Sequence, residues 1–224
     1  MKIGILGSGV VGQTLGAKLV ERGEDVVLGT RSPNQLGEKR GMGAPLSEWL
    51  SRTAGKARIA GFADTAAHGE IVINATSGTG SLEALTLAGE KNLGDKILMD
   101  VSNPLDFSHG MPPRLTVCNT DSLGEQIQRA FPKARVVKTL NTTNAMVMVD
   151  PMRVAGGDHD LFVSGNDAAA KARVTELLKQ WFGWRSVIDL GDITTARGAE
   201  MILPIWVRLM GALGTPMFNF KISR

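Results

Sequence analysis

The 224-residue chain has no tyrosine, one cysteine and three histidines, and each shortage excludes a kind of chemistry. Without tyrosine there is no Tyr/Lys proton relay of the kind that carbonyl reductases often use. Because Cys118 is the single cysteine, the chain has no internal disulfide, no two-cysteine zinc site and no dithiol redox pair. The histidines, His68, His109 and His159, lack metal-ligand spacing. We therefore expect no metal site and no thiol chemistry.

Charge and long hydrophobic runs are also scarce. The 25 Lys and Arg residues nearly balance the 22 Asp and Glu residues, no run of like charges occurs, and aromatic residues make up 5% of the chain. This composition gives no support for nucleic-acid binding. The longest apolar stretch, residues 201–213, contains Pro204 and Arg208 and is too short to cross a bilayer. The N-terminus has the pattern of a strand and not of a signal peptide. We expect a soluble, cytoplasmic protein with no membrane or nucleic-acid partner.

A predicted strand, a glycine turn and a predicted helix follow one another at the start of the chain. An apolar run leads into the sequence GSGVVG at residues 7–12, and a helical pattern follows. In this arrangement Gly7 permits a tight turn, Gly9 lets the backbone approach a pyrophosphate, and Gly12 lets the helix pack closely on the strand. The helix N-terminus offers free N–H groups and a partial positive charge to phosphates. The order and spacing are those of a dinucleotide-binding fingerprint.

The second predicted strand indicates which dinucleotide is bound. An NAD site usually ends this strand with an acidic residue that accepts hydrogen bonds from the ribose 2′-hydroxyl. Here Thr30, Arg31 and Ser32 follow the strand, so a guanidinium and two hydroxyls lie where a 2′-phosphate would bind. Lys39 or Arg40 would add a second positive charge. The alternative is that Arg31 is simply solvated in a loop. The pattern favours NADP(H) over NAD(H).

Three later predicted strands end in hydroxyl and amide side chains. The carboxyl ends of parallel strands are where open α/β sheets bind ligands, and hydride transfer needs a positioned donor and acceptor more than an acid or a base. Asn103, Asn141 and Thr142 are therefore the candidates to lie near a nicotinamide ring. The segments that follow the three strands are Ala75-Thr76-Ser77, Ser102-Asn103-Pro104 and Asn141-Thr142-Thr143-Asn144.

Alternating strands and helices predict an α/β fold, a Rossmann-type doubly wound and mostly parallel sheet with a small C-terminal helical extension. We assign residues 1–192 to an NADP-binding domain and residues 193–224 to a helix and tail of the same compact unit. The C-terminal helix is apolar nearly all round and bent by Pro204, so every face must be covered. Two explanations stay open: a homodimer interface, or burial within one chain.

Four segments carry a resemblance to the NADPH-dependent coenzyme F-420 reductase family, and it extends to the related nucleotide domain of membrane ferric reductases. The resemblance covers nearly the whole chain. It implies a Rossmann domain, commonly dimeric, in which NADP(H) exchanges a hydride with a deazaflavin held over the nicotinamide. The segments are residues 7–12, Leu28-Gly29-Thr30-Arg31, Lys138-Thr139-Leu140-Asn141-Thr142 and Ala196-Arg197-Gly198-Ala199-Glu200.

The resemblance also implies roles for single residues. It places one group at the pyrophosphate turn, a second at the 2′-phosphate, a third along the ribose and pyrophosphate, and a fourth near the nicotinamide and acceptor. The sequence from Asn141 to Met146 departs from that of the deazaflavin reductases and is closer to a bacterial subgroup, so the acceptor is either the deazaflavin or another flavin-like molecule. In order, the groups are Ser8, Val10 and Val11; Thr30, Arg31 and Ser32; Thr76 and Ser77; and Asn103 and Asn141. We also expect Gly7, Gly9, Gly12, Lys39, Ala75 and Pro104 to contact the cofactor.

Pyrroline-5-carboxylate reductases and 3-hydroxyacid dehydrogenases begin with similar domains but continue into a longer helical substrate domain. About thirty residues follow Asp192, which is enough for one long helix. We therefore expect an oxidoreductase that passes hydride between NADP(H) and a small redox acceptor. The alternative is an NADP(H)-binding sensor or scaffold without turnover, which would share the whole pocket.

Overall fold

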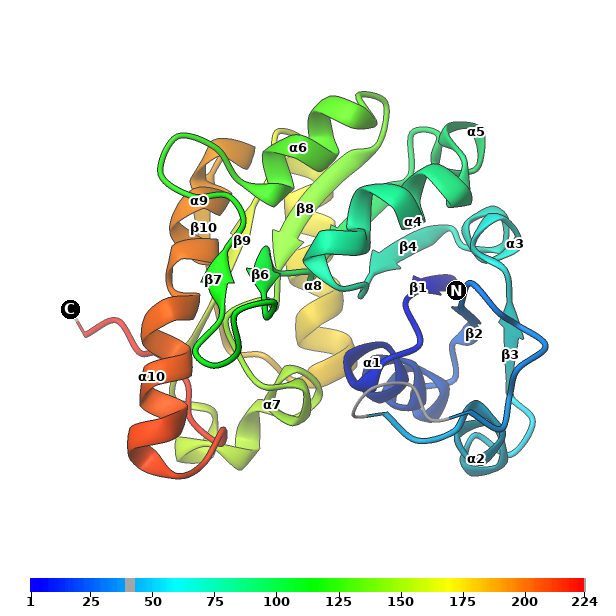
Figure 1. Ribbon diagram of the computed structural model, residues 1–224, viewed down its shortest axis with the longest axis horizontal. Helices are drawn as coiled ribbons and strands as arrows, with labels where there is room; N and C mark the ends of the chain where they lie inside the picture. The colour runs from blue at the N-terminus through cyan, green and yellow to red at the C-terminus, as the bar shows by residue number, and fades with distance from the viewer. Residues whose placement is uncertain (39–42, 224) are drawn as a thin grey trace.

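In the computed structural model, which describes residues 1–38 and 43–223, eight strands form one sheet with helices on both faces (Figure 1). A separate two-stranded hairpin lies beside it. The strands of the large sheet are β1 (Lys2–Leu6), β2 (Asp25–Gly29), β3 (Ala57–Ala60), β4 (Ile71–Asn74), β5 (Ile97–Asp100), β8 (Arg135–Thr139), β9 (Asp160–Ser164) and β10 (Ser186–Gly191), and the hairpin is β6 (Leu105–Asp106) with β7 (Arg114–Leu115).

The order of the strands is β10-β9-β8-β5-β4-β1-β2-β3. From β3 to β8 every pair is parallel, with the chain winding outward in both directions from β1, as in a doubly wound dinucleotide-binding sheet. The pair β8–β9 is antiparallel and β9–β10 is parallel, so the last two strands run against the other six. The prediction of a mostly parallel α/β sheet is confirmed, and the antiparallel edge was not foreseen.

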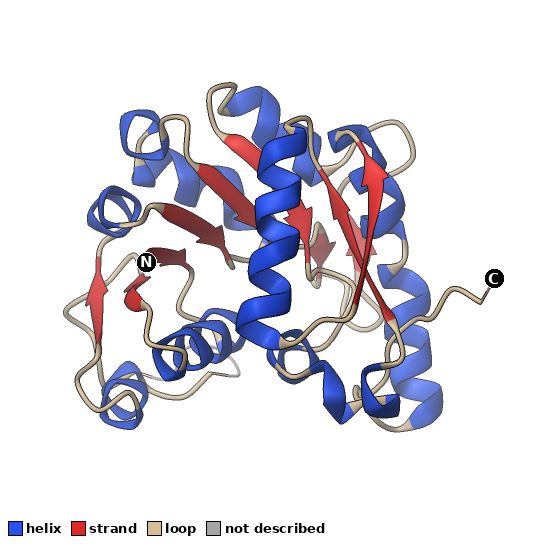
Figure 2. Ribbon diagram, turned by 180° about the vertical axis from the view of Figure 1, so that it is seen from behind, coloured by secondary structure: helices blue, strands red, loops and turns tan. Residues whose placement is uncertain are grey.

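The helices form two layers that enclose the sheet. Helices α1, α2, α7 and α8 cover one face, and α3, α4, α5 and α6 cover the other. In Figure 2, which views the molecule from behind, the long helix α8 crosses its face of the sheet. The helices are α1 (Val10–Glu21), α2 (Leu46–Arg52), α3 (Phe62–His68), α4 (Ser81–Ala88), α5 (Glu90–Leu93), α6 (Leu123–Ala130), α7 (Ala145–Val149), α8 (Ala168–Phe182), α9 (Ala196–Met201) and α10 (Leu203–Leu213), with short 3-10 helices at Gly78–Gly80, Pro151–Arg153, Ala155–Gly157 and Ile193–Thr195.

Local sequence signals account for the ends of the longest helix. Asp167 caps α8: its carboxylate accepts a 2.7 Å hydrogen bond from the Ala170 N–H. Gly183 ends the helix in the left-handed conformation, at φ 85°. Most predicted strands agree with the observed ones to within one or two residues. Helix α4 and the β6–β7 hairpin were not predicted.

The C-terminal helix is broken where proline requires it. A single helix to Leu213 was expected, but α9 and α10 are separate, with Ile202 between them. Pro204 has no N–H to donate to the Glu200 carbonyl, so the helical hydrogen-bond pattern cannot run through this point. Within the described residues of α10, Leu203 is the one buried side chain, while Ile205 is 51% exposed. The explanation that this helix is buried within one chain is therefore wrong. No helix among the described residues is long and apolar enough to span a bilayer.

Candidate functional site

The glycine turn between β1 and α1 has the geometry that its spacing predicts. Gly7 has φ 113°, and a Cβ there would lie 2.5 Å from the Ala75 carbonyl oxygen. A Cβ on Gly12 would lie 1.9 Å from the Gly7 carbonyl oxygen, so only glycine lets α1 start this close to the strand. A Cβ on Gly9 would meet nothing within 4 Å. The backbone at Gly9 is thus open to an approaching ligand.

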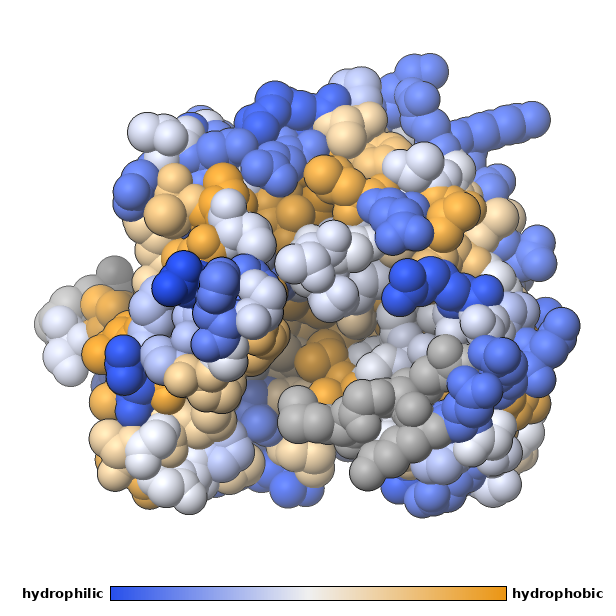
Figure 3. All heavy atoms as spheres, viewed as in Figure 1, coloured by the Kyte–Doolittle hydropathy of each residue, from blue (hydrophilic) through white to orange (hydrophobic). Residues whose placement is uncertain are grey.

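A cleft of about 350 Å³ opens at the carboxyl ends of β1, β2 and β4, with α4 as its opposite wall. This is the edge where doubly wound sheets bind nucleotides. The face of the molecule seen in Figure 3 is hollowed near its centre. The cleft is lined by Gly7, Ser8, Gly9, Thr30, Arg31, Phe62, Ala75, Thr76, Ser77, Gly80, Glu83 and Ala84.

The charged side chains of the cleft come from β2 and α4. The Arg31 side chain is 70% exposed, and its Nη1 lies 3.9 Å from the Glu83 carboxylate. Sequence reasoning found no carboxylate at the end of β2, yet α4 brings one to the same place. Thr30 is buried and its hydroxyl accepts a 3.4 Å hydrogen bond from the Ser32 N–H. Lys39, the predicted second cation, and Arg40 lie outside the described residues.

Side-chain hydrogen bonds fix the loop that follows β4. The Thr76 hydroxyl donates to Asn74 Oδ1 at 2.7 Å and lies 2.8 Å from the Ser81 hydroxyl at the start of α4. A Cβ on Gly78 would lie 1.9 Å from the Asn103 carbonyl oxygen, so this loop packs directly on the loop after β5. The Ala75-Thr76-Ser77 segment therefore lines the cleft and also borders the predicted nicotinamide residues.

Asn103 and Asn141 bond to each other across the ends of β5 and β8. Asn103 Nδ2 donates to the Asn141 carbonyl at 2.9 Å, and Asn141 Nδ2 donates to Asn103 Oδ1 at 3.0 Å. Asn141 Nδ2 also donates to the Ala199 carbonyl at 3.1 Å, which ties α9 to the pair. Leu140, immediately before, is buried with φ 61°, a conformation that non-glycine residues adopt mainly where surrounding structure enforces it. We call Asn103 and Asn141 the amide pair.

Beneath the amide pair lies a set of three charged residues that we call the buried charge cluster: Asp100, Lys138 and Glu200. The Lys138 ammonium lies 2.8 Å from each carboxylate and donates to the Ser102 carbonyl at 2.7 Å. The three side chains are at most 2% exposed. Burial opposes the charge on Lys138, but the two carboxylates outweigh it and raise the pKa of Lys138 above its ordinary value. The ammonium is therefore retained in the core.

Strand register and a helix N-terminus complete the cluster. Asp100 lies opposite Lys138 in the sheet and accepts a 2.9 Å hydrogen bond from Asn74, which lies opposite it on β4. Glu200 accepts hydrogen bonds from the Leu123 and Gly124 N–H groups at 2.9 and 3.0 Å. These are the first amides of α6, whose partial positive charge favours a carboxylate. The two acids are thus compensated by one lysine, amide donors and a helix N-terminus.

The remaining candidates from the sequence do not line the cleft. Val11 is partly buried against the core, and Val10 faces a separate groove beside α1, so the geometry does not bring either to the cleft lining. Pro104 and Thr142 are buried. The hydroxyls of Thr142 and Thr143 are buried without a hydrogen-bond partner among the described residues. The described residues contain no group of side chains that could hold a metal ion.

The functional candidates that sequence reasoning missed are Glu83 and Glu200. Glu83 lies on a helix and nothing in its local pattern marks it, whereas Glu200 ends one of the four segments that carry the resemblance but was given no role there. For Asp100 and Lys138 a signal exists, since both are charged residues in apolar strands. Pairing them with one another and with Glu200 required the strand register and the position of α9.

Three comparisons relate this site to known proteins. A crystal structure of a candidate F420-dependent NADP reductase from Arthrobacter sp. FB24 superposes with TM-score 0.95 and 60% identity, covering all of both chains. A family model described as "NADP oxidoreductase coenzyme F420-dependent" matches residues 2–104. This chain belongs to the coenzyme F420-dependent NADP oxidoreductase family. It is therefore an oxidoreductase of the NADP-dependent class.

More distant relatives match over most of this chain. The F420-dependent NADP reductase of Methanocaldococcus jannaschii is 29% identical over 213 residues, which is 93% of this chain and 92% of that protein. The metalloreductase STEAP3 of Rattus norvegicus is 29% identical over 222 residues, and this chain spans 39% of its length. A reductive aminase from Aspergillus terreus has TM-score 0.62 and 15% identity, a likeness that shows the fold alone.

Proposed function

We propose that the cleft binds NADP(H) and that the protein transfers hydride between it and a flavin-like or deazaflavin acceptor. The observation that carries the proposal is the placement of Arg31 beside an open glycine turn at the same edge of the sheet. Family membership supports the same conclusion, because the family is described by this pair of cofactors.

The cleft fits the nucleotide in three respects. Gly9 leaves room for a pyrophosphate against the backbone, and the N-terminus of α1 offers N–H groups and a partial positive charge. Arg31 is 70% exposed, so its guanidinium can turn from Glu83 and fork onto a 2′-phosphate, and Thr30 lines the same part of the cleft. Ser8, Thr76 and Ser77 add hydroxyl groups along the cleft between these ends. In this assignment the protein binds both phosphate groups mainly through backbone amides and one guanidinium.

The acceptor end is assigned to the amide pair and the residues that follow it. When bound, NADPH would supply the hydride for reduction of the acceptor. The protein's part is to position: the amide pair is held at fixed spacing by its reciprocal hydrogen bonds and by Ala199. Thr142 and Thr143 follow β8 directly, and their buried hydroxyls have no hydrogen-bond partner among the described residues.

The assignment of the nucleotide is tested by changing Arg31 to alanine. We expect Arg31→Ala to weaken NADPH binding at least about tenfold and NADH binding much less, since only NADPH has the 2′-phosphate that the guanidinium would hold. Isothermal titration with each nucleotide gives the two dissociation constants. Equal losses for NADPH and NADH would refute the 2′-phosphate assignment.

The assignment of the acceptor is tested with a panel of deazaflavin, FMN, FAD and ferric chelates, following NADPH by its absorbance. Oxidation with one acceptor and not the others identifies it. Binding of NADPH without oxidation by any acceptor would instead indicate a sensor or scaffold. The hydroxyl and amide side chains that follow β4, β5 and β8 favour the enzyme, because they supply polar groups beside the nucleotide cleft.

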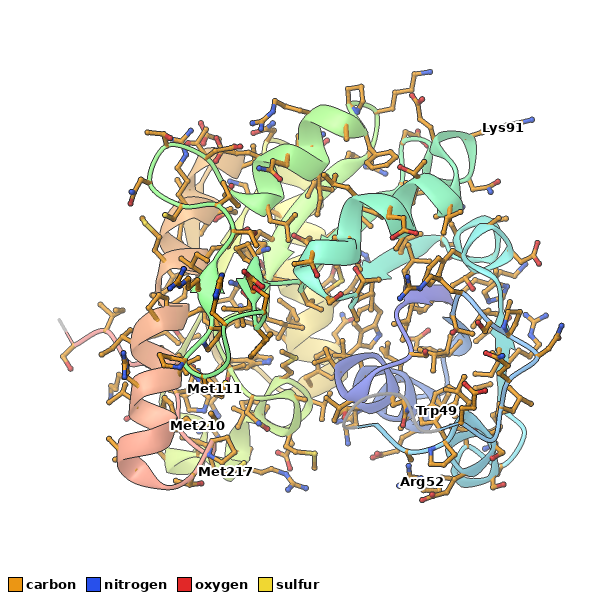
Figure 4. The ribbon with its side chains drawn as sticks, viewed as in Figure 1. Trp49, Arg52, Lys91, Met111, Met210 and Met217 are labelled. Atoms are coloured by element: carbon orange, nitrogen blue, oxygen red, sulfur yellow. The ribbon has the colours of Figure 1, made fainter. Side chains whose placement is uncertain are left out.

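We also propose that α10 forms a homodimer interface. Ile205 and Leu213 on α10 are 51% and 56% exposed, and Met111 at the tip of the hairpin is 62% exposed. In Figure 4, Met210 is labelled on α10, and Met111 and Met217 are labelled close to that helix. An apolar helix surface of this kind is stable in water when a partner covers it. Light scattering should give a dimer for the unmodified protein and a monomer for Ile205→Glu; a monomer in both cases would contradict the proposal.

A further inference from the structure

We propose that Glu83 limits the preference of the cleft for NADP(H) over NAD(H) by competing with the 2′-phosphate for Arg31. The proposal rests on the proposed function, since it takes the cleft as the nucleotide site. The absence of an acidic residue at the end of β2 predicts a site selective for NADP(H). The structure supplies that missing carboxylate from α4, 52 positions after Arg31 in the chain.

Glu83 is held in place by the helix that carries it. Ser81, at the start of α4, is fully buried, and its hydroxyl donates to the Ser77 carbonyl and accepts from Asn74, both at 3.2 Å. Ala84, next to Glu83, is 4% exposed and packs in the core. The first turn of α4 is therefore pinned to the end of β4. The Glu83 side chain projects from this fixed turn into the cleft lining, with 64% of its surface exposed.

The charges in the cleft give Glu83 opposite effects on the two nucleotides. Among the described residues that line the cleft, Arg31 and Glu83 are the ones with charged side chains. A 2′-phosphate bound by Arg31 would lie within a few ångströms of the Glu83 carboxylate, and these like charges repel. NADH has a ribose hydroxyl in that position, which can donate a hydrogen bond to a carboxylate. Glu83 thus penalises the phosphate and tolerates or favours the hydroxyl.

A second consequence is the state of Arg31 before the nucleotide arrives. The guanidinium lies 3.9 Å from Glu83 and must give up part of that attraction when it turns to a phosphate. Both side chains are mostly exposed, so the attraction is modest and is screened by salt. The penalty on NADPH should therefore shrink as ionic strength rises.

The test is to replace Glu83 with glutamine and measure nucleotide binding directly. Glu83→Gln keeps the size of the side chain and removes its charge. We expect the dissociation constant of NADPH to fall about threefold to fivefold at low salt, with that of NADH unchanged or raised. At about 0.5 M salt the difference between the variant and the unmodified protein should nearly vanish. Titration by nucleotide fluorescence measures binding without any acceptor.

Glu90→Gln is the matched control. Glu90 is an exposed residue of the neighbouring helix α5 and does not line the cleft. Its replacement by glutamine changes the net charge by the same amount as Glu83→Gln. It should leave both dissociation constants unchanged. The proposal is overturned if Glu83→Gln leaves the ratio of NADPH to NADH affinity unchanged, or shifts it no more than Glu90→Gln does. If the unmodified protein binds neither nucleotide, the proposed function fails instead, so the two failures are distinguishable.

Discussion

The glycine-turn cleft and the buried charge cluster lie at the same edge of one sheet, but they are built in different ways. The cleft begins with six consecutive residues, 7–12, whose spacing is decided by local backbone geometry. The cluster joins Asp100, Lys138 and Glu200, which are separated by 38 and 62 positions in the chain. A single short motif therefore predicts the first region, whereas the members of the second lie in separate segments that no local pattern joins.

The two regions also differ in their exposure to solvent. Arg31 and Glu83 in the cleft are 70% and 64% exposed, whereas Lys138 and Asp100 have no exposed side-chain surface. Exposed charges interact weakly with each other and remain available to a ligand. Buried charges interact strongly but depend on every partner being present. The cleft is suited to binding, and the cluster holds together the strand ends on which the amide pair rests.

Removing the charge of Lys138 should have the largest effect. Lys138→Met leaves two buried carboxylates without their ammonium partner, and we expect a loss of about 3–5 kcal/mol in the free energy of unfolding. Urea denaturation followed by tryptophan fluorescence measures it. Lys171 is a matched control, since its ammonium also bonds a carboxylate, Asp189, and a backbone carbonyl, but Asp189 is 53% exposed.

Lys171→Met should cost about 1 kcal/mol, because the partner carboxylate remains in water. If the two lysine variants lost equal amounts of free energy of unfolding, the buried ion pairs would contribute no more than the exposed one, contrary to our prediction. The double variant Lys138→Met/Glu200→Gln removes one of the two orphaned carboxylates, so it should be more stable than Lys138→Met alone.

The next largest loss of stability is expected for Gly12→Ala, and Gly9 of the same turn provides the comparison. A Cβ on Gly12 would lie 1.9 Å from the Gly7 carbonyl, so Gly12→Ala should lower the free energy of unfolding by about 2–3 kcal/mol. A Cβ on Gly9 meets nothing within 4 Å, so Gly9→Ala should cost less than about 1 kcal/mol but weaken NADPH binding. Thermal unfolding and nucleotide titration of both variants check this. A Gly9→Ala protein with full affinity would contradict the open approach to the backbone.

The smallest effect is expected at the helix that supports the cluster. The Ser122 hydroxyl caps α6: it accepts a 3.1 Å hydrogen bond from the Glu125 N–H and donates to the Glu125 carboxylate at 2.7 Å. Ser122→Ala should cost about 1 kcal/mol in the free energy of unfolding. Because Glu200 bonds the Leu123 and Gly124 amides independently, nucleotide affinity should not change. A loss of affinity would mean that this cap also positions the cleft.

The local patterns were sufficient for the fold class. The glycine turn, the strand that precedes it and the Asp167 cap each depend on residues a few positions apart, so their geometry follows from backbone sterics and nearby hydrogen bonds. The reversed direction of β9 and β10 was not visible, because strand direction depends on how the chain returns to the sheet. The apolar residues of the C-terminal helix left two explanations open, a homodimer interface and burial within one chain, and only the exposed position of α10 in the structure excluded the second.

For the candidate site, the sequence by itself predicted an open turn at Gly9 and placed Arg31 directly after the second strand, and the proposed nucleotide end depends on these two features. The tertiary structure decided the rest. It brought Glu83 to Arg31, which turns an apparently cationic pocket into one of mixed charge. It also placed Lys138 between two carboxylates. Without them, a buried lysine in a strand would destabilise the fold. The physical reason is that charge interactions act across space, between side chains whose separation only the packed fold sets.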